Sequence, residues 1–257
     1  MTSTGAPVAA DPAKGTVRGV WFRLLRMLLL LLAKLLVGLQ MEGLGNVPRD
    51  TGVLVVANHL HNADPLLMSI AFPRPLHFMA KEELIRIPVL GWLLTKFGNF
   101  PVARGKSDRK AIRHAINALE HGIAVGMFPE GTRSRSMGLS QAHAGAGLVA
   151  LQGKRQILPM AITGSERLPF NGKRPAHLMP ARGHKGVRIR IGTAFALPET
   201  GPEGKRLTPA EATQIIMREI AELLPEDYRG IYRSSGPSSS SSNRSNSDSA
   251  RNAAATN

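Results

Sequence analysis

The stretch of sequence that decides the fold is GVLVVANHLHNADPLLMSIAF, residues 52–72. Residues 52–57 form a short, apolar and β-branched run, which predicts a buried strand. An aspartate at the N-cap and a proline at the first helical position are a common helix start, so Asp64-Pro65 predicts a helix through residues 66–72. A buried strand that passes through a polar turn into a helix is typical of α/β folds.

The same alternation of strands and helices continues along the chain from about residue 40. Further strands are predicted at 76–80, 99–103, 123–128, 157–162 and 187–191, and helices at 82–97, 107–121 and 145–152. Thr208-Pro209-Ala210-Glu211 has the pattern of a capping box and predicts a helix that ends at Leu224. We therefore expect a β-sheet layered with α-helices.

Composition limits the classes of function. The 257 residues carry a formal net charge of +15, and nearly all of it lies between the two polar ends of the chain. A basic body favours anionic partners. The chain has no cysteine, which excludes disulfides, thiolate zinc sites, iron–sulfur clusters and a cysteine nucleophile. Only 5% of the residues are aromatic, so base stacking is poorly supported and we expect no nucleic-acid partner.

The chain divides into four parts. Residues 1–18 and the Ser- and Asn-rich residues 234–257 are predicted to be disordered, because neither can bury enough apolar surface to offset the ordering entropy. Residues 19–40 are predicted to form a hydrophobic, amphipathic membrane-anchoring helix, and residues 41–230 the main folded domain. A core helix of a soluble domain and a short transmembrane helix remain alternatives for 19–40.

The leucine-rich helix has a basic edge. Arg23, Arg26 and Lys34 fall within an arc of roughly 80° on a helical projection, and leucines cover much of the remaining surface. Such a helix suits a membrane interface, with its apolar face in the lipid and its cations towards the phosphates.

The polar turn after the first predicted strand carries a histidine and a carboxylate. Asp64 follows His59 by five residues, a spacing that can return the carboxylate to the imidazole across the turn. Asp64 would then hold one ring nitrogen and leave the other to take a proton. His61 is a competing base, and a histidine and a capping aspartate without a joint role is the other alternative.

A second polar segment, FPEGTRSR, residues 128–135, follows another predicted strand. Arginine suits bidentate phosphate binding, and glycine lets the backbone approach a ligand, so Glu130, Gly131 and Arg133 are candidate binding residues. An ion-paired surface loop is the alternative. The strand-like segment 98–105 ends in Arg104-Gly105, and the apolar segment 158–164 by itself predicts a core strand.

Other chemistries lack their motifs. The chain has neither a nucleophile elbow nor a Walker A loop. Residues 145–150, GAGLVA, fit a dinucleotide fingerprint, but no strand immediately precedes them, so we interpret them as a close-packed helix start. No set of histidines and carboxylates has metal-ligand spacing, and we expect no metal.

Taken together and in this order, these segments resemble the lysophospholipid acyltransferase family, in particular the bacterial 1-acyl-sn-glycerol-3-phosphate acyltransferases. N-H-x-x-x-x-D at 58–64 and F-P-E-G-T-R-S at 128–134 are similar to the two signature blocks of that family. Residues 101–104 and 158–161 are similar to its other blocks, and Ala80-Lys81-Glu82-Glu83-Leu84 also matches. The resemblance covers roughly residues 20–225.

The resemblance implies a mixed, mostly parallel sheet flanked by helices and an N-terminal membrane anchor. It implies transfer of a fatty acyl group from acyl-CoA or acyl-carrier protein, as co-substrate and without a cofactor, to the free hydroxyl of lysophosphatidic acid. His59 would be the base and Asp64 its partner, whereas Arg133, Glu130, Arg104 and Lys81 would contact the acceptor. Backbone amides near Gly131 are candidates for steadying the oxyanion.

With the basic body, the resemblance also implies an anionic membrane surface as a partner, at the cytoplasmic face of the cell membrane. Three alternatives stay open: another acceptor, such as glycerol 3-phosphate or a different lysolipid; a thioester hydrolase, in which water replaces the alcohol; and a non-catalytic basic membrane or nucleic-acid binder.

Overall fold

The protein is represented by a computed structural model. It describes residues 20–49, 51–81, 88, 91, 100–102, 109–134, 136–169, 186–201 and 204–233. The predicted disorder of 1–18 and 234–257, nearly all of the helix predicted at 82–97, and Arg104 lie outside these residues.

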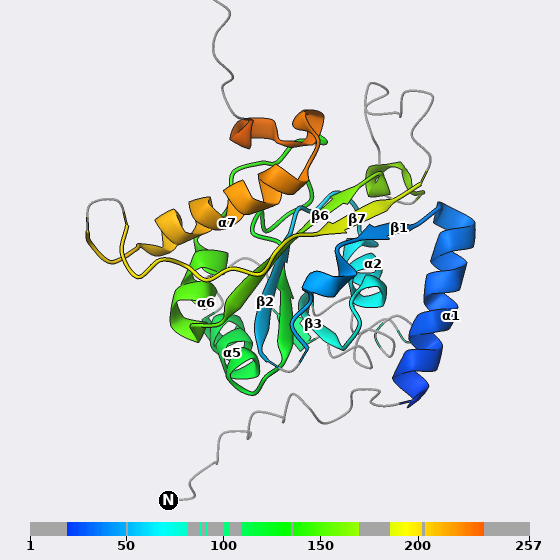
Figure 1. The fold of residues 1–257 in the computed structure, drawn as a ribbon, viewed down its shortest axis with the longest axis horizontal. Helices are drawn as coiled ribbons and strands as arrows, with labels where there is room; N and C mark the ends of the chain where they lie inside the picture. Colours follow the sequence, from blue (N-terminus) through cyan, green and yellow to red (C-terminus); the bar gives the residue numbers. More distant parts are fainter. Residues whose placement is uncertain are drawn as a thin grey trace, which may run out of the picture.

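The described strands form one sheet between two layers of helices (Figure 1). In the order β1-β7-β6-β2-β5-β3-β4, the strands span Gln40–Glu42, Arg188–Ile191, Gln156–Thr163, Val53–Ala57, Ala124–Met127, Leu76–Lys81 and Phe100–Val102. Neighbouring strands pair in parallel except for β6 and β7, which are antiparallel. The mixed, mostly parallel sheet is therefore confirmed.

Helices cover both faces of this sheet. The α-helices span Val20–Val37 (α1), Asp64–Ala71 (α2), Arg109–Glu120 (α5), Gly145–Gly153 (α6) and Pro209–Leu223 (α7), and the 3-10 turns Leu44–Asn46 (η1), Ser165–Arg167 (η2), Glu226–Tyr228 (η4) and Gly230–Tyr232 (η5). Helices α1 and α2 pack on one face, and α5, α6 and α7 on the other. Strand β2 is buried on both faces, which explains its continuous apolar sequence.

The central strands bring distant polar segments to one edge of the sheet. Strands β5 and β6 both pair with β2 in parallel, so all three end at the same edge. Asn58 continues this pairing with its side chain: its Nδ2 donates to the carbonyl of Ile162 and its Oδ1 accepts from the amide of Ile162, each at 2.8 Å. The carboxyl ends of parallel strands are where ligands bind in such sheets.

Helix α1 has two apolar faces. Phe22, Leu29, Leu30 and Ala33 lie on the side that faces the domain. The opposite side exposes Val20, Leu24, Met27, Leu28, Leu31, Leu32, Leu35 and Leu36, of which the last two are 72% and 78% exposed. Within the described part of the chain, no helix combines the length and the hydropathy needed to cross a bilayer.

Arg26 does not lie on an exposed basic edge, so this part of the expectation for α1 is wrong. Its Nε donates to the carbonyl of Phe72 at 2.8 Å, and its Nη2 to that of Ala71 at 3.0 Å. These carbonyls end helix α2, where a cation is favourable. Arg26 therefore attaches α1 to the domain, whereas Arg23 and Lys34 are exposed.

The start of α2 also differs from the prediction. Ala63 is the N-cap residue, Asp64 is the first helical residue, and no side chain caps the helix. Asp64 does not cap α2 because its carboxylate turns back to the preceding residues, as described below. The capping box of α7 is present as predicted, with Thr208 and Glu211 bonded in both directions.

Of the two glycines at the start of α6, Gly147 serves close packing, as predicted, whereas Gly145 faces open space. A Cβ added at Gly147 would lie 2.1 Å from the carbonyl oxygen of Pro209 in α7. The Gly147 amide also donates to the hydroxyl of Thr213 at 3.0 Å. Only a residue without a side chain permits this approach of the two helices.

We expect Gly147→Ala to lower the free energy of unfolding by about 1–3 kcal/mol, because the added methyl group must push α6 away from α7. Urea denaturation followed by circular dichroism measures the change. Gly145→Ala in the same helix is the control: nothing lies within 4 Å of its added Cβ, so its stability should be unchanged or higher. Equal stability of the two variants would contradict the packing role.

Candidate active site

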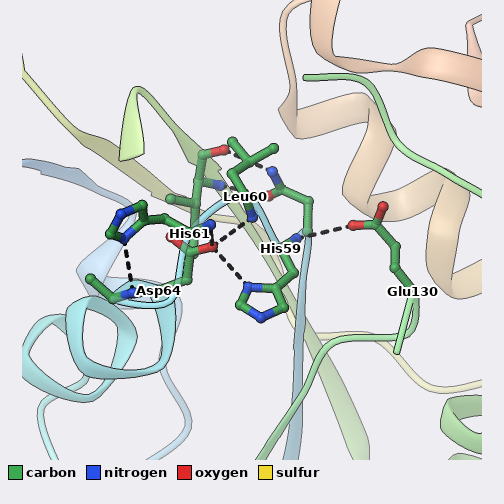
Figure 2. Close-up of polar contacts among 8 residues, drawn as sticks. His59, Leu60, His61, Asp64 and Glu130 are labelled. Atoms are coloured by element: carbon green, nitrogen blue, oxygen red, sulfur yellow. Dashed lines mark hydrogen bonds and ion pairs between the residues drawn. The ribbon is translucent and has the colours of Figure 1, made fainter. Parts of the chain in front are cut away.

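One carboxylate holds together the turn between β2 and α2 (Figure 2). Oδ2 of Asp64 accepts hydrogen bonds from the amides of Leu60 and His61, both at 2.6 Å, and lies 2.9 Å from Nδ1 of His59. Asp64 is fully buried. Donors converging on one oxygen compensate the burial of the charge and fix the turn around it.

This contact determines the chemical state of His59. A carboxylate only accepts, so Nδ1 of His59 carries the proton and Nε2 keeps its lone pair. Among the described residues, Nε2 of His59 has no hydrogen-bond partner, and the side chain is 11% exposed. The ring is therefore oriented by Asp64 on one side and can accept a proton on the other.

Phe128 contacts the same ring from its face, a contact that the sequence did not predict. The centroids of His59 and Phe128 are 4.1 Å apart with 19° between the ring planes, and Phe78 stacks behind Phe128 at 5.6 Å. An aromatic face favours a cation above it, so this stack stabilises the imidazolium that forms when His59 takes a proton. The only signal in the sequence was an aromatic residue at the end of a strand.

His61 is excluded as the base by its own hydrogen bonds. Its Nδ1 accepts from the amide of Ala63, and its Nε2 donates to the carbonyl of Pro169, each at 3.0 Å. An amide N–H only donates and a carbonyl only accepts, so the ring is neutral with its proton on Nε2. Both nitrogens are occupied, and of the two candidates only His59 keeps an open nitrogen.

Glu130 holds the turn between β2 and α2, residues 58–63 and called the catalytic turn below, to the loop after β5. Its Oε1 accepts from the amide of His59 at 3.0 Å, and its Oε2 from the amide and the hydroxyl of Ser140, at 3.0 and 2.6 Å. The residue is 1% exposed. Both oxygens thus face protein donors, whereas the resemblance implied that they contact the acceptor.

The loop that carries Gly131 and Arg133 lies against the catalytic turn. The amide of Ser134 donates to the carbonyl of His59 at 2.7 Å. Gly131 has a φ of +67°, and its amide donates to the carbonyl of Phe128 at 3.0 Å. Because this amide closes the turn, Gly131 does not offer it to an oxyanion. The positive φ explains the glycine.

Arg133 lines an open cavity of about 490 Å³ beside this turn. Its other lining residues are Thr132, Ser134, Ser136 and Ser140. A guanidinium suits bidentate binding of an anion with several acceptor oxygens, such as a phosphate. Ser134 and Ser140 also contact His59 and Glu130, so the cavity and the histidine belong to one site.

The remaining predicted residues are placed less fully. Lys81 is the last residue of β3, whose carboxyl end lies at the same edge of the sheet as that of β5. Arg104 lies outside the described residues. The structure thus brings together His59, Asp64, Glu130, Gly131 and Arg133.

Comparisons with known proteins point to one family. A family model described as Acyltransferase matches residues 38–163. A "1-acyl-sn-glycerol-3-phosphate acyltransferase" of Bacillus subtilis is 33% identical over 138 residues, which cover 53% of this chain and 66% of the relative. A "Probable 1-acyl-sn-glycerol-3-phosphate acyltransferase" of Mycoplasma genitalium is 32% identical over 199 residues, with 72% and 68% covered.

The solved structures include a similar fold. The crystal structure of the 1-acyl-sn-glycerophosphate acyltransferase PlsC of Thermotoga maritima has a TM-score of 0.54 and 25% identity, and covers 72% of this chain and 71% of that one. The chain spans about half to two thirds of the length of the first curated relatives that it matches. With the blocks at His59 and Glu130 in place, the chain belongs to the acyltransferase family that contains the 1-acyl-sn-glycerol-3-phosphate acyltransferases.

Proposed function

We propose that the protein transfers a fatty acyl group from acyl-CoA or acyl-carrier protein to the free hydroxyl of lysophosphatidic acid, forming phosphatidic acid. The observation that carries this proposal is the pair His59 and Asp64, with Nδ1 and Oδ2 2.9 Å apart, beside the Arg133 cavity. The names of the related proteins support the choice of acceptor.

The reaction needs a base because an alcohol is a poor nucleophile. Nε2 of His59 removes the hydroxyl proton as the oxygen attacks the thioester carbonyl. Asp64 and the face of Phe128 stabilise the resulting imidazolium. When the tetrahedral intermediate collapses, the carbon–sulfur bond breaks, and the imidazolium returns its proton to the departing sulfur. The products are the ester and a thiol.

Arg133 supplies the contact with the acceptor phosphate. Its cavity adjoins the catalytic turn, so a phosphate bound there places the glycerol hydroxyls near His59. Glu130 keeps the two parts of the site together by binding His59 and Ser140 at once. Arg133 thus binds the substrate, and Glu130 keeps the catalytic turn in place against the loop after β5.

The exposed leucine face of α1 attaches the protein to the cytoplasmic face of the cell membrane. Apolar side chains such as Leu35 and Leu36 are favourable in the lipid interface, and the exposed Arg23 and Lys34 face its phosphates. The acceptor is a lipid that resides in the membrane, so a protein bound at the membrane surface has direct access to it.

We expect His59→Ala and Asp64→Asn to lower kcat for acylation of lysophosphatidic acid by about 10²- to 10⁴-fold, because each removes general-base catalysis. Labelled acyl-CoA or acyl-carrier protein with lysophosphatidic acid vesicles measures the product. His121→Ala, at an exposed histidine directly after α5, is the control and should keep wild-type activity.

Parallel assays separate the alternatives. Reactions with glycerol 3-phosphate, with another lysolipid and without an acceptor identify the preferred acceptor, and thiol release without acyl lipid would indicate a hydrolase. Wild-type transfer by the His59→Ala protein would refute the proposed chemistry altogether.

We expect Arg133→Ala to raise KM for lysophosphatidic acid by about 10- to 100-fold, the loss of one charge-assisted contact with phosphate. Steady-state kinetics with lysophosphatidic acid and with monoacylglycerol, which lacks the phosphate, measure the effect. The KM for monoacylglycerol should hardly change with the substitution. An equal loss with both acceptors would show that Arg133 acts on something other than the phosphate.

We expect the double variant Leu35→Asp/Leu36→Asp to bind anionic vesicles at least about 10-fold more weakly, since it puts two charges on the apolar face of α1. Vesicle sedimentation measures the bound fraction. Ile231→Asp is the matched control: Ile231 is 67% exposed, but lies in η5, far from α1 in the chain. Added salt should weaken the binding steeply, and unchanged binding of the double variant would contradict this role for α1.

A further inference from the structure

His61 has no part in the reaction described above, yet both of its ring nitrogens are used within the protein. Ala63 donates to Nδ1, and Nε2 donates to the carbonyl of Pro169 (Figure 2 shows the first of these bonds). The residue is only 5% exposed and lies two positions after His59. A neutral ring buried in this way acts by position rather than by charge.

The two bonds of His61 have different reach. The bond from Ala63 is local and spans two residues, as in the turns that asparagine and serine side chains form with the backbone. The bond to Pro169 joins segments 108 residues apart and needs the far nitrogen of the ring. A short polar side chain can replace the first bond but cannot reach the second partner.

The segment that His61 contacts is itself fixed. Tyr228 donates to Oε1 of Glu166 in η2 at 2.9 Å. Burial and the nearby Glu166 carboxylate raise the pKa of Tyr228 to about 12, so its hydroxyl keeps its proton at neutral pH. The amide of Leu168 closes the turn onto the carbonyl of Ser165. The bond to Pro169 therefore connects the catalytic turn to η2 and the turn after it, a segment that is itself held in place by hydrogen bonds.

The other contacts of the catalytic turn lie elsewhere. Asn58 holds its start to β6, and Glu130 and Ser134 hold the backbone of His59 to the loop after β5. His61 holds the far end of the catalytic turn, and its own backbone amide donates to Asp64. A displacement of this end moves the carboxylate, and with it the ring of His59.

We propose that His61 is a positioning residue for acyl transfer, which acts through the bond from its Nε2 to the carbonyl of Pro169. This bond fixes the position of the far end of the catalytic turn relative to η2. It thereby also positions the Asp64–His59 pair. The inference rests on the proposed function, because it concerns the placement of the same base. A displacement of about 1 Å at a reacting group can cost up to about 100-fold in rate.

Substitutions at position 61 can separate the two bonds. His61→Asn and His61→Ser keep an oxygen for the amide of Ala63 but do not reach Pro169. His61→Gln carries an amide N–H near the place of Nε2 and loses the local bond. We expect the Asn and Ser variants to lose about 10- to 100-fold in kcat, with KM for lysophosphatidic acid within twofold, and the Gln variant to stay within about threefold of wild type.

Several outcomes would overturn the proposal. Full activity of the Asn and Ser variants, a loss confined to the Gln variant, or a change in KM alone would each do so. Thermal unfolding of every variant shows whether a loss of kcat merely follows a loss of stability, and that result would also count against a positioning role.

A measurement on the wild-type protein does not depend on any variant. Nitrogen-15 NMR of the histidine rings should show His61 protonated at Nε2 and bare at Nδ1 at neutral pH. The opposite tautomer would refute the bond to Pro169. If the wild-type protein transferred no acyl group, the proposed function would fail instead, while the NMR result would still report on His61.

Discussion

The site depends on a single buried carboxylate. Oδ2 of Asp64 accepts from two backbone amides and faces Nδ1 of His59, so the same oxygen shapes the turn and orients the base. Without that acceptor, two buried N–H groups would lose their partner, at a cost of about 1–3 kcal/mol each. The turn can therefore be stable only in a conformation that also aims His59, and folding and preparation for catalysis are one event here.

The parallel sheet explains why residues far apart in the chain meet at this turn. Strands β5 and β6 flank β2, so the loops that follow them lie on either side of His59. Glu130 and Ser134 reach the turn from the side of β5, and Asn58 binds Ile162 of β6 on the other side. The loop after β2 supplies the base of the proposed chemistry, and the loop after β5 supplies the contact with the phosphate. Hydrogen bonds between these two loops hold them together.

The strong local signals in the sequence predicted their elements correctly, as the apolar run of β2 and the capping box of α7 show. The spacing of His59 and Asp64 also predicted their contact. The prediction for Arg26 is wrong because a distant partner changes the role of the residue: Arg26 binds the end of α2 instead of facing outward. The contact between Glu130 and Ser140 was likewise not predicted. Strand β1, only three residues long and partly polar, has no pattern of its own and exists through its pairing with β7.

The two histidines of the turn show why residue type alone does not assign a role. His59 and His61 share one turn and one chemistry, but His59 has a carboxylate on one nitrogen and an open second nitrogen, whereas His61 has an amide donor on one and a carbonyl on the other. The first arrangement stabilises a ring that gains a proton, and the second favours one that stays neutral. Catalytic capacity follows from the partner of each nitrogen, so a second histidine close to the base can serve the reaction without ever carrying its proton.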